Sequence, residues 1–289
     1  MFSTQSHPEG EIIPPPPSTL PVEGYAPPEA YSPEQARRRR EFSVWDPRSA
    51  PGTYILLAAN IAVYLWMILH GVSPKEPSEG ALIHYGSNHT WLVLHGEWYR
   101  LLTATFVHVG LLHLATNMWC LWNLGILGEP LLGPYGMIAV YMLTGIAGNL
   151  LSMGTDVLEF LTYHAPGYLF QVGAGASGAV FGIAGILIVL LSNRRLPFPW
   201  EELRRLRSSV VKFALINLVI GLSTMFVNVG IRIDNSAHIG GFLSGLALGV
   251  PLLPRMTAGR ERYLGRQKIT FAGACLILAL VGYFIAHFA

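Results

Sequence analysis

Charged residues are scarce in this chain of 289 residues, of which only 12% are Asp, Glu, Lys or Arg. Soluble globular domains usually contain about twice that fraction. The mean hydropathy is +0.43, and the charges form short groups that separate long uncharged stretches. A helix needs roughly 20 apolar residues to cross a bilayer. Core helices of a soluble protein would supply one or two such stretches, but this sequence has seven, which argues against a soluble fold.

The seven stretches cover residues 53–70, 104–128, 131–153, 174–193, 211–229, 236–253 and 269–288. Their number and length predict an all-α polytopic membrane protein with seven transmembrane helices.

Cysteine is also rare, and both copies, Cys120 and Cys275, fall inside predicted spans. This placement gives no sign of a disulfide framework.

The N-terminal segment shows no apolar core of the kind found in cleavable signal peptides. Residues 1–36 are rich in proline and polar residues, which predicts a disordered tail. The run ARRRR at 36–40 is more typical of a basic anchor on an anionic lipid surface than of nucleic-acid binding.

Lysine and arginine are distributed unevenly over the predicted loops. Of the 19, all except Lys75, Arg100 and Arg232 fall on one side of the membrane. Loops rich in these residues face the cytoplasm. We therefore expect a cytoplasmic N-terminus and, after seven spans, a C-terminus on the outer side. The outer loops are then 71–103, 154–173 and 230–235, and the inner connections are 129–130, 194–210 and 254–268.

Four polar side chains lie in the outer halves of three predicted spans that all run inward. His113 and Asn117 belong to 104–128, Ser177 opens 174–193, and His238 lies near the start of 236–253. Polar groups inside a membrane usually face the interior of the bundle. Because the orientation was inferred from Lys and Arg alone, the shared depth is independent support for a common site.

Ser177 and His238 suit nucleophilic catalysis. A serine becomes a good nucleophile when a base removes its proton, and histidine titrates near neutral pH. Each residue also has an ordinary alternative. Ser177 could ease a helix contact or bond to its own helix, and His238 could make a hydrogen bond between helices.

His113 and Asn117 are four residues apart and share one helix face. They could donate hydrogen bonds to a developing oxyanion, or they could simply join helices. The chain has ten histidines, so a metal site is a further alternative. It is less favoured, because neither a second nitrogen ligand nor a carboxylate lies at ligand spacing nearby.

Small residues recur at every fourth position in two of the spans. They are Ala237, Gly241, Gly245 and Gly249 in one span, and Gly178 and Gly182 in the other. Such faces allow two helices to approach closely. The pattern predicts that the helices of Ser177 and His238 pack together and bring the two side chains within reach.

The motifs GASG (175–178), HLATN (113–117) and AHIGGFLSGLALG (237–249) together resemble the rhomboid intramembrane serine proteases. The stretch EWYRLLTATFVHVGLLH and Glu129 extend the resemblance. It implies a rhomboid-like helical bundle, with residues 49–256 as a catalytic six-helix core. Residues 1–48 would be a cytoplasmic tail, and 257–289 a linker with an extra C-terminal transmembrane helix.

The resemblance also implies roles for single residues. Ser177 would be the nucleophile and His238 the general base and then acid, with no acidic third member. His113, Asn117 and the Ser177 amide would form an oxyanion hole. Supporting roles are expected for Gly175, Gly178, Phe181, Gly241, Gly245, Arg100 and Glu129.

Two positions call for separate interpretation. Asp234 precedes His238 by four residues, and we interpret it as a solvated residue near a helix N-terminus, where negative charge is favourable. The family usually has Trp-Arg in the first outer loop, where this chain has Tyr99-Arg100.

The implied activity is hydrolysis of single-span transmembrane proteins within the lipid bilayer, without a cofactor, a metal or a nucleic acid. We expect the protein to reside in the bacterial inner membrane, with its active site opening on the outer side. The alternatives are a catalytically silent rhomboid-like protein that binds transmembrane helices, and a transporter. The presence of both Ser177 and His238 argues against the first. A transporter would favour charges at mid-membrane, and none lies clearly there.

Overall fold

The computed structural model describes residues 46–196, 198–223, 234–253 and 259–289. The tail expected at 1–48 lies outside this part of the chain, apart from residues 46–48. The elements are η1 (Pro47–Ser49), α2 (Pro51–Leu69), α3 (Glu79–His84), β1 (Asn88–His89), α4 (Thr90–Leu94), α5 (Arg100–Thr103), α6 (Leu111–Tyr163), η2 (Pro166–Phe170), β2 (Val172–Gly173), α7 (Ser177–Leu190), α8 (Trp200–Ser223), α9 (Asn235–Leu252) and α10 (Arg260–Phe288).

The described residues form an all-α fold, as the sequence predicts, with one two-stranded sheet. Within the described ranges, three helices, α2, α6 and α10, are long and apolar enough to cross a membrane. Helix α7 is apolar but has only 14 residues. The count of seven spans stays a prediction, because residues 224–229 at the end of the fifth stretch lie outside the described residues.

Several predicted boundaries were wrong. The second and third stretches join in α6, whose break lies at Gly133 (φ 73°, ψ 166°) rather than at 129–130. Helix α6 continues to Tyr163, ten residues into the expected outer loop, and α8 begins at Trp200 rather than at 211. The reason is physical: Glu, Arg and Leu favour helices irrespective of hydropathy. Apolar stretches therefore mark the expected membrane depth but not the ends of helices.

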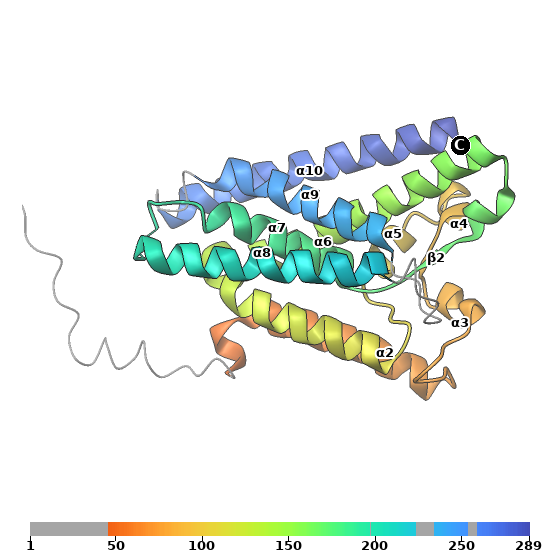
Figure 1. Cartoon of the computed structure of the whole chain (residues 1–289), viewed down its shortest axis with the longest axis horizontal. Helices are drawn as coiled ribbons and strands as arrows, with labels where there is room; N and C mark the ends of the chain where they lie inside the picture. Colours follow the sequence, from red (N-terminus) through yellow and green to blue (C-terminus); the bar gives the residue numbers. More distant parts are fainter. Residues whose placement is uncertain (1–45, 197, 224–233, 254–258) are drawn as a thin grey trace, which may run out of the picture. The chain divides into compact units, whose positions relative to one another are not determined.

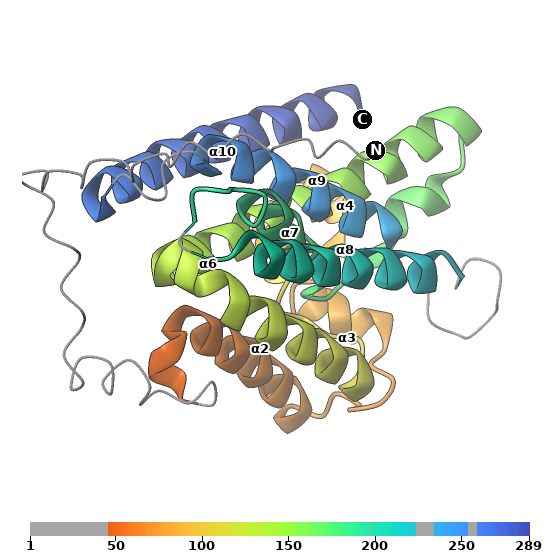
Figure 2. The same ribbon diagram turned by 60° about the vertical axis from the view of Figure 1, so that its left-hand side comes forward.

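Helix α7 lies at the centre of the bundle, beside α6, α8 and α9 (Figures 1 and 2). All residues from Gly178 to Leu187 are buried. A helix that is apolar all round and covered by its neighbours is a core helix. Its surroundings therefore explain how it can be shorter than a typical lipid-facing span.

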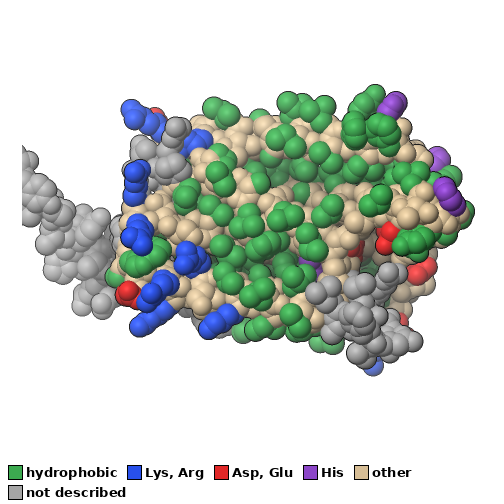
Figure 3. Space-filling view, turned by 45° about the horizontal axis from the view of Figure 1, so that its top comes forward, with side chains coloured by type: hydrophobic (Ala, Val, Ile, Leu, Met, Phe, Trp, Pro, Cys, Tyr) green, Lys and Arg blue, Asp and Glu red, His purple; other side chains and the backbone are tan. Residues whose placement is uncertain are grey.

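The surface divides into an apolar band and two polar ends. Figure 3 shows hydrophobic side chains across the middle and Lys and Arg side chains at one end. Exposed basic residues in the connection before α8, in α8 and at the start of α10 are Arg194, Arg195, Arg204, Arg205, Lys212, Arg260, Arg262 and Lys268. The outer-loop elements α3, α4, α5 and β2 lie at the other end (Figure 1). This division is typical of a protein that crosses a bilayer.

Helix α10 packs along α6 near both of its ends. Gln267 is completely buried, and its Nε2 donates to the carbonyl oxygen of Leu132 at 2.7 Å, next to the break at Gly133. Farther along α10, a Cβ at Gly282 would lie 3.1 Å from the ring of Trp98 in the long outer loop. The last helix therefore contacts both the bend in α6 and the outer loop.

The closest helix contact joins α7 and α9 through glycines. A Cβ at Gly241 would collide with the carbonyl oxygen of Gly178, and a Cβ at Gly245 with that of Gly182. Small residues allow this backbone approach, which is the main route to helix association in lipid. The two helices that carry Ser177 and His238 are thus held at a spacing that only glycine permits.

We expect Gly245→Val to destabilise the protein by about 1–3 kcal/mol or more, because the added side chain overlaps the backbone of α7. The melting temperature of purified protein measures the effect. Gly273→Val is the matched control, since a Cβ at Gly273 in α10 meets nothing within 4 Å. Equal melting temperatures for the two variants would contradict the assignment of this contact.

Candidate active site

Ser177 is the first residue of α7, and its side chain is half-buried. The chain reaches it from β2, which pairs antiparallel with β1 of the outer loop, Gly173 opposite Asn88. Between β2 and α7, Gly175 has φ +136°, a conformation that L side chains rarely adopt. The backbone amide of Gly175 donates to the carbonyl of Ala104 at 2.9 Å. The hydroxyl therefore stands at a helix N-terminus, on the outer-loop side of the bundle.

His238 lies in the first turn of α9, and its Nε2 is 2.8 Å from Oγ of Ser177. The ring of Phe181 stacks on the imidazole, with centroids 4.4 Å apart and planes 15° apart. Nδ1 of His238 has no hydrogen-bond partner among the described residues. The structure thus brings serine and histidine together as an isolated pair, in contact through the nitrogen that would accept the serine proton.

Asp234 is the N-cap of α9 and not a partner of the His238 ring. One carboxylate oxygen accepts the amide of Ala237 at 2.9 Å, and the other accepts the hydroxyl of Ser152 at 2.5 Å. The cap satisfies an amide that the helix leaves free. The predicted place of Asp234 at a helix N-terminus is confirmed, but its side chain is half-buried and bonded to α6, not solvated as expected.

His113 and Asn117 both lie in the first two turns of α6, and His113 lies beside the segment that leads to Ser177. A Cβ at Gly175 would lie 2.5 Å from Cε1 of His113, so the imidazole packs against the backbone that leads to the serine. Asn117 is buried, and its Nδ2 donates to the carbonyl of His113 at 2.9 Å. One N–H of this amide is therefore used within its own helix, and the second N–H remains to donate elsewhere.

His108 is completely buried beside this group and was not among the residues predicted for the site. Its Nε2 accepts the backbone amide of Ala176 at 3.4 Å, and its ring centroid lies 5.4 Å from that of His113. The spacing of five residues, interrupted by Gly110, fits no helical face. Only the fold places this histidine near Ser177.

The family model for the rhomboid domain matches residues 95–255.

The chain belongs to the rhomboid family.

Similar curated proteins carry names from that family. Rhomboid protease GluP of Bacillus subtilis is 31% identical over 256 residues, which are 88% of this chain and 44% of that protein. Rhomboid protease AarA of Providencia stuartii is 33% identical over 208 residues, 68% of this chain and 71% of that protein. RHOMBOID-like protein 5 of Arabidopsis thaliana is 35% identical over 184 residues, which are 63% of this chain and 53% of that protein. The chain thus spans less than half of GluP and about seven tenths of AarA.

Rhomboid membership and the apolar helices make this chain an integral membrane protein. Among the described residues, no group of three or more His, Cys, Asp or Glu side chains is placed to hold a metal ion.

Each remaining predicted site residue has a definite place in the fold. Gly178, Gly241 and Gly245 form the α7–α9 contact described above.

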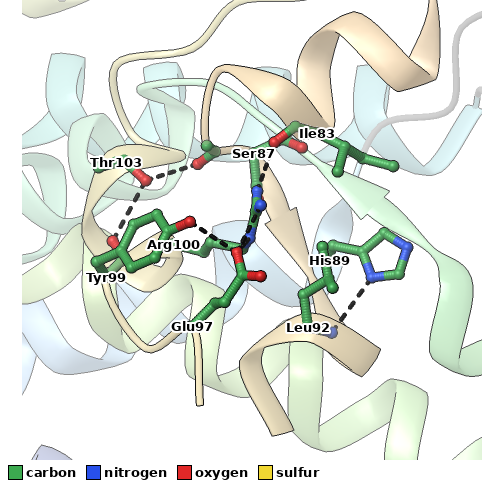
Figure 4. A network of polar contacts seen from close by, with 9 residues as sticks. Ile83, Ser87, His89, Leu92, Glu97, Tyr99, Arg100 and Thr103 are labelled. Carbon is green, nitrogen blue, oxygen red and sulfur yellow. Dashed lines mark hydrogen bonds and ion pairs between the residues drawn. The ribbon is translucent and has the colours of Figure 1, made fainter. Parts of the chain in front are cut away.

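Arg100 contacts several separate parts of the outer loop, as Figure 4 shows. Its guanidinium pairs with Glu97 at 2.7 Å and donates to the carbonyls of Ile83 at 2.6 Å and Ser87 at 3.2 Å. The Tyr99 hydroxyl donates to the same Glu97 carboxylate at 2.6 Å. The tyrosine in place of the family's usual tryptophan therefore joins the network that orders this loop.

Glu129 lies away from the site and anchors the N-terminus of α2. Its carboxylate accepts the amides of Gly52 at 2.8 Å and Thr53 at 2.7 Å, and also the Thr53 hydroxyl at 2.6 Å. A buried carboxylate is stabilised there because it meets free amides at the positive end of a helix dipole. Its contacts thus support the bundle, not the site itself.

The outer-loop network predicts a dependence of stability on pH. Hydrogen bonds from Tyr99 and Arg100 hold the pKa of Glu97 below the usual range of a glutamate. A depressed carboxyl pKa contributes stability above that range, and the contribution is lost as the pH falls through the lowered value. We expect Glu97→Gln to lower the melting temperature at neutral pH, with a difference that shrinks as the pH falls below the usual pKa range of a glutamate.

Glu79→Gln is the control, because Glu79 is an exposed glutamate of the same loop. It should change the melting temperature little at any pH. A wild-type advantage over Glu97→Gln that stays constant down to the acid limit would show that the Glu97 charge does not stabilise the loop.

Proposed function

We propose that this rhomboid is an intramembrane serine endopeptidase that hydrolyses peptide bonds in or near the transmembrane segments of membrane-anchored proteins. The observation that carries the proposal is the 2.8 Å contact between Ser177 Oγ and His238 Nε2. The names of two relatives as rhomboid proteases support it. In this proposal residues 49–256 are the catalytic six-helix core, and 257–289 are a linker with an additional transmembrane helix.

The proposed reaction has two halves. In the first, His238 takes the Ser177 proton while Oγ bonds to the scissile carbonyl carbon, and the histidine then gives that proton to the departing amine. In the second, water loses a proton to His238 and attacks the acyl-serine, and the proton returns to Ser177 as the acid leaves. The steps use only the chain's own groups, the substrate and water. The uncharged Phe181 ring stacked on His238 keeps the imidazole oriented for both transfers.

The oxyanion formed in each half needs hydrogen-bond donors. We propose that the Ser177 amide, at the N-terminus of α7, supplies one, and that His113 and Asn117 supply the others. Backbone amides at a helix start are free to donate and lie at the positive end of the helix dipole. The Asn117 amide donates one N–H to the His113 carbonyl and would donate its second N–H to the oxyanion.

We propose the bacterial inner membrane as the location, with the N-terminus in the cytoplasm and the C-terminus and site opening on the outer side. The basic end of the molecule in Figure 3 supports this orientation, since loops rich in Lys and Arg face the cytoplasm. Strand β2, which leads into the segment that carries Ser177, lies toward the opposite end (Figure 1). The proposed substrates are single-span transmembrane proteins that reach the site through the lipid bilayer.

The second candidate is a catalytically silent rhomboid-like protein that binds transmembrane helices without cutting them. A transporter is the third. The serine–histidine contact favours a protease over both, because neither binding nor transport requires a nucleophile next to a base. The following two predictions separate these functions.

We expect Ser177→Ala and His238→Ala each to abolish cleavage of a single-span substrate, while the melting temperature stays near that of wild type. A fluorophosphonate probe should label wild type but not Ser177→Ala. Ser244→Ala is the control, because Ser244 lies in α9 and bonds to the Gly241 carbonyl of its own helix. Undiminished proteolysis by Ser177→Ala would end the serine-protease proposal.

We expect Asn117→Ala and His113→Ala to lower kcat by about 10²–10³, with a smaller effect on KM, because an oxyanion donor acts mainly in the transition state. Asn123→Ala is matched to the first variant, since Asn123 bonds to a carbonyl of the same helix, that of Trp119, but is exposed. If both site variants turn over at the wild-type rate, His113 and Asn117 serve only to join helices.

A further inference from the structure

Both ring nitrogens of His108 are in contact with backbone groups. Nδ1 lies 3.2 Å from the carbonyl oxygen of Phe106, and Nε2 lies 3.4 Å from the amide nitrogen of Ala176. A carbonyl only accepts a hydrogen bond and an amide only donates one. The proton of the neutral ring therefore sits on Nδ1, and Nε2 is the acceptor. The two backbone groups thus select one tautomer of a completely buried ring.

The amide that His108 accepts belongs to the residue before Ser177. Ala176 is the N-cap of α7, and its own side chain makes no capping bond. The preceding amide, that of Gly175, is bonded to the carbonyl of Ala104. Two consecutive amides ahead of the serine are therefore held by one short segment of chain, residues 104–108. The amide of Ser177 is the next one in the sequence.

His108 also lies against His113, with ring centroids 5.4 Å apart. His113 in turn packs on Gly175, as its close approach to a Cβ there shows. One buried ring thus contacts both the backbone that orients the Ser177 amide and the imidazole proposed as an oxyanion donor.

We propose that His108 is a positioning residue for the oxyanion hole. By accepting the Ala176 amide it fixes the Gly175–Ala176 peptide, which adjoins the peptide that carries the Ser177 amide, and so helps to direct that amide towards the substrate oxygen. The inference rests on the proposed protease function and adds a residue to it. Donors fixed in advance stabilise a developing charge without reorganisation. A small misplacement of such groups lowers the rate of the chemical step.

The test compares His108→Gln, His108→Asn and His108→Leu. Glutamine can place its carbonyl oxygen about where Nε2 lies, whereas asparagine is too short and leucine has no acceptor. We expect the leucine and asparagine variants to lose about 100-fold in kcat with little change in KM. The glutamine variant should stay within a few-fold of wild type. The rate of fluorophosphonate labelling should follow the same order.

His89→Leu is the matched control. His89 is also buried, and its Nδ1 accepts a backbone amide at a helix start, that of Leu92 at 3.4 Å, but it caps α4 in the outer loop. We expect this variant to lower the melting temperature and to keep its kcat. If it loses as much kcat as His108→Leu, general loosening explains both effects and the proposal is wrong.

Other outcomes of the same series also test the positioning role of His108. Wild-type kcat in both His108→Leu and His108→Asn would overturn the positioning role, as would a glutamine variant as slow as asparagine. Should the leucine variant not fold, the comparison of glutamine with asparagine gives the answer. Ser177→Ala in the same series separates the two proposals. If it still cleaves, the proposal that Ser177 is the nucleophile fails, whereas its inactivity beside fully active His108 variants would refute only the inference about His108.

Discussion

The backbone contact between α7 and α9 is the constraint on which the site depends. Gly178 follows Ser177 directly, and Gly241 lies one turn after His238, so the glycine pair adjoins the serine–histidine pair along both helices. In lipid there is no hydrophobic force to press helices together, and close packing of small residues takes its place. Any side chain at Gly241 or Gly245 would push the helices apart. The 2.8 Å contact of serine and histidine would then be lost.

A second group of contacts holds the start of α7 from the outer-loop side. Strand β2 is paired with β1, Gly175 is bonded to Ala104, and Ala176 is bonded to His108. The loop itself is ordered by the buried guanidinium of Arg100. Ser177 therefore sits between two rigid parts, a helix packed through glycines and a loop built on polar contacts. Rigid support of this kind is what a preorganised site requires.

The sequence predicted the all-α fold, the glycine face and the residues that the structure brings together. Each of these had a local signal. Ser177, His113, Asn117 and His238 stood out because polar groups are costly in an apolar span, and they shared a depth once Lys and Arg had set the orientation. Hydropathy failed at helix ends, as in α6 and α8, because helix formation continues through polar residues of good propensity.

The sequence by itself therefore determined the class of the protein and the side chains available for a site, because composition and spacing are properties of the chain. Only the tertiary structure decided the contacts between distant segments. In the fold, the Ala176 amide donates to His108, and the Ser152 hydroxyl donates to the capping carboxylate of Asp234. The side-chain amide of Gln267 donates to the carbonyl of Leu132. Such contacts have no period in the sequence, because each depends on how far two helices approach and turn, and that is set by packing over their whole length.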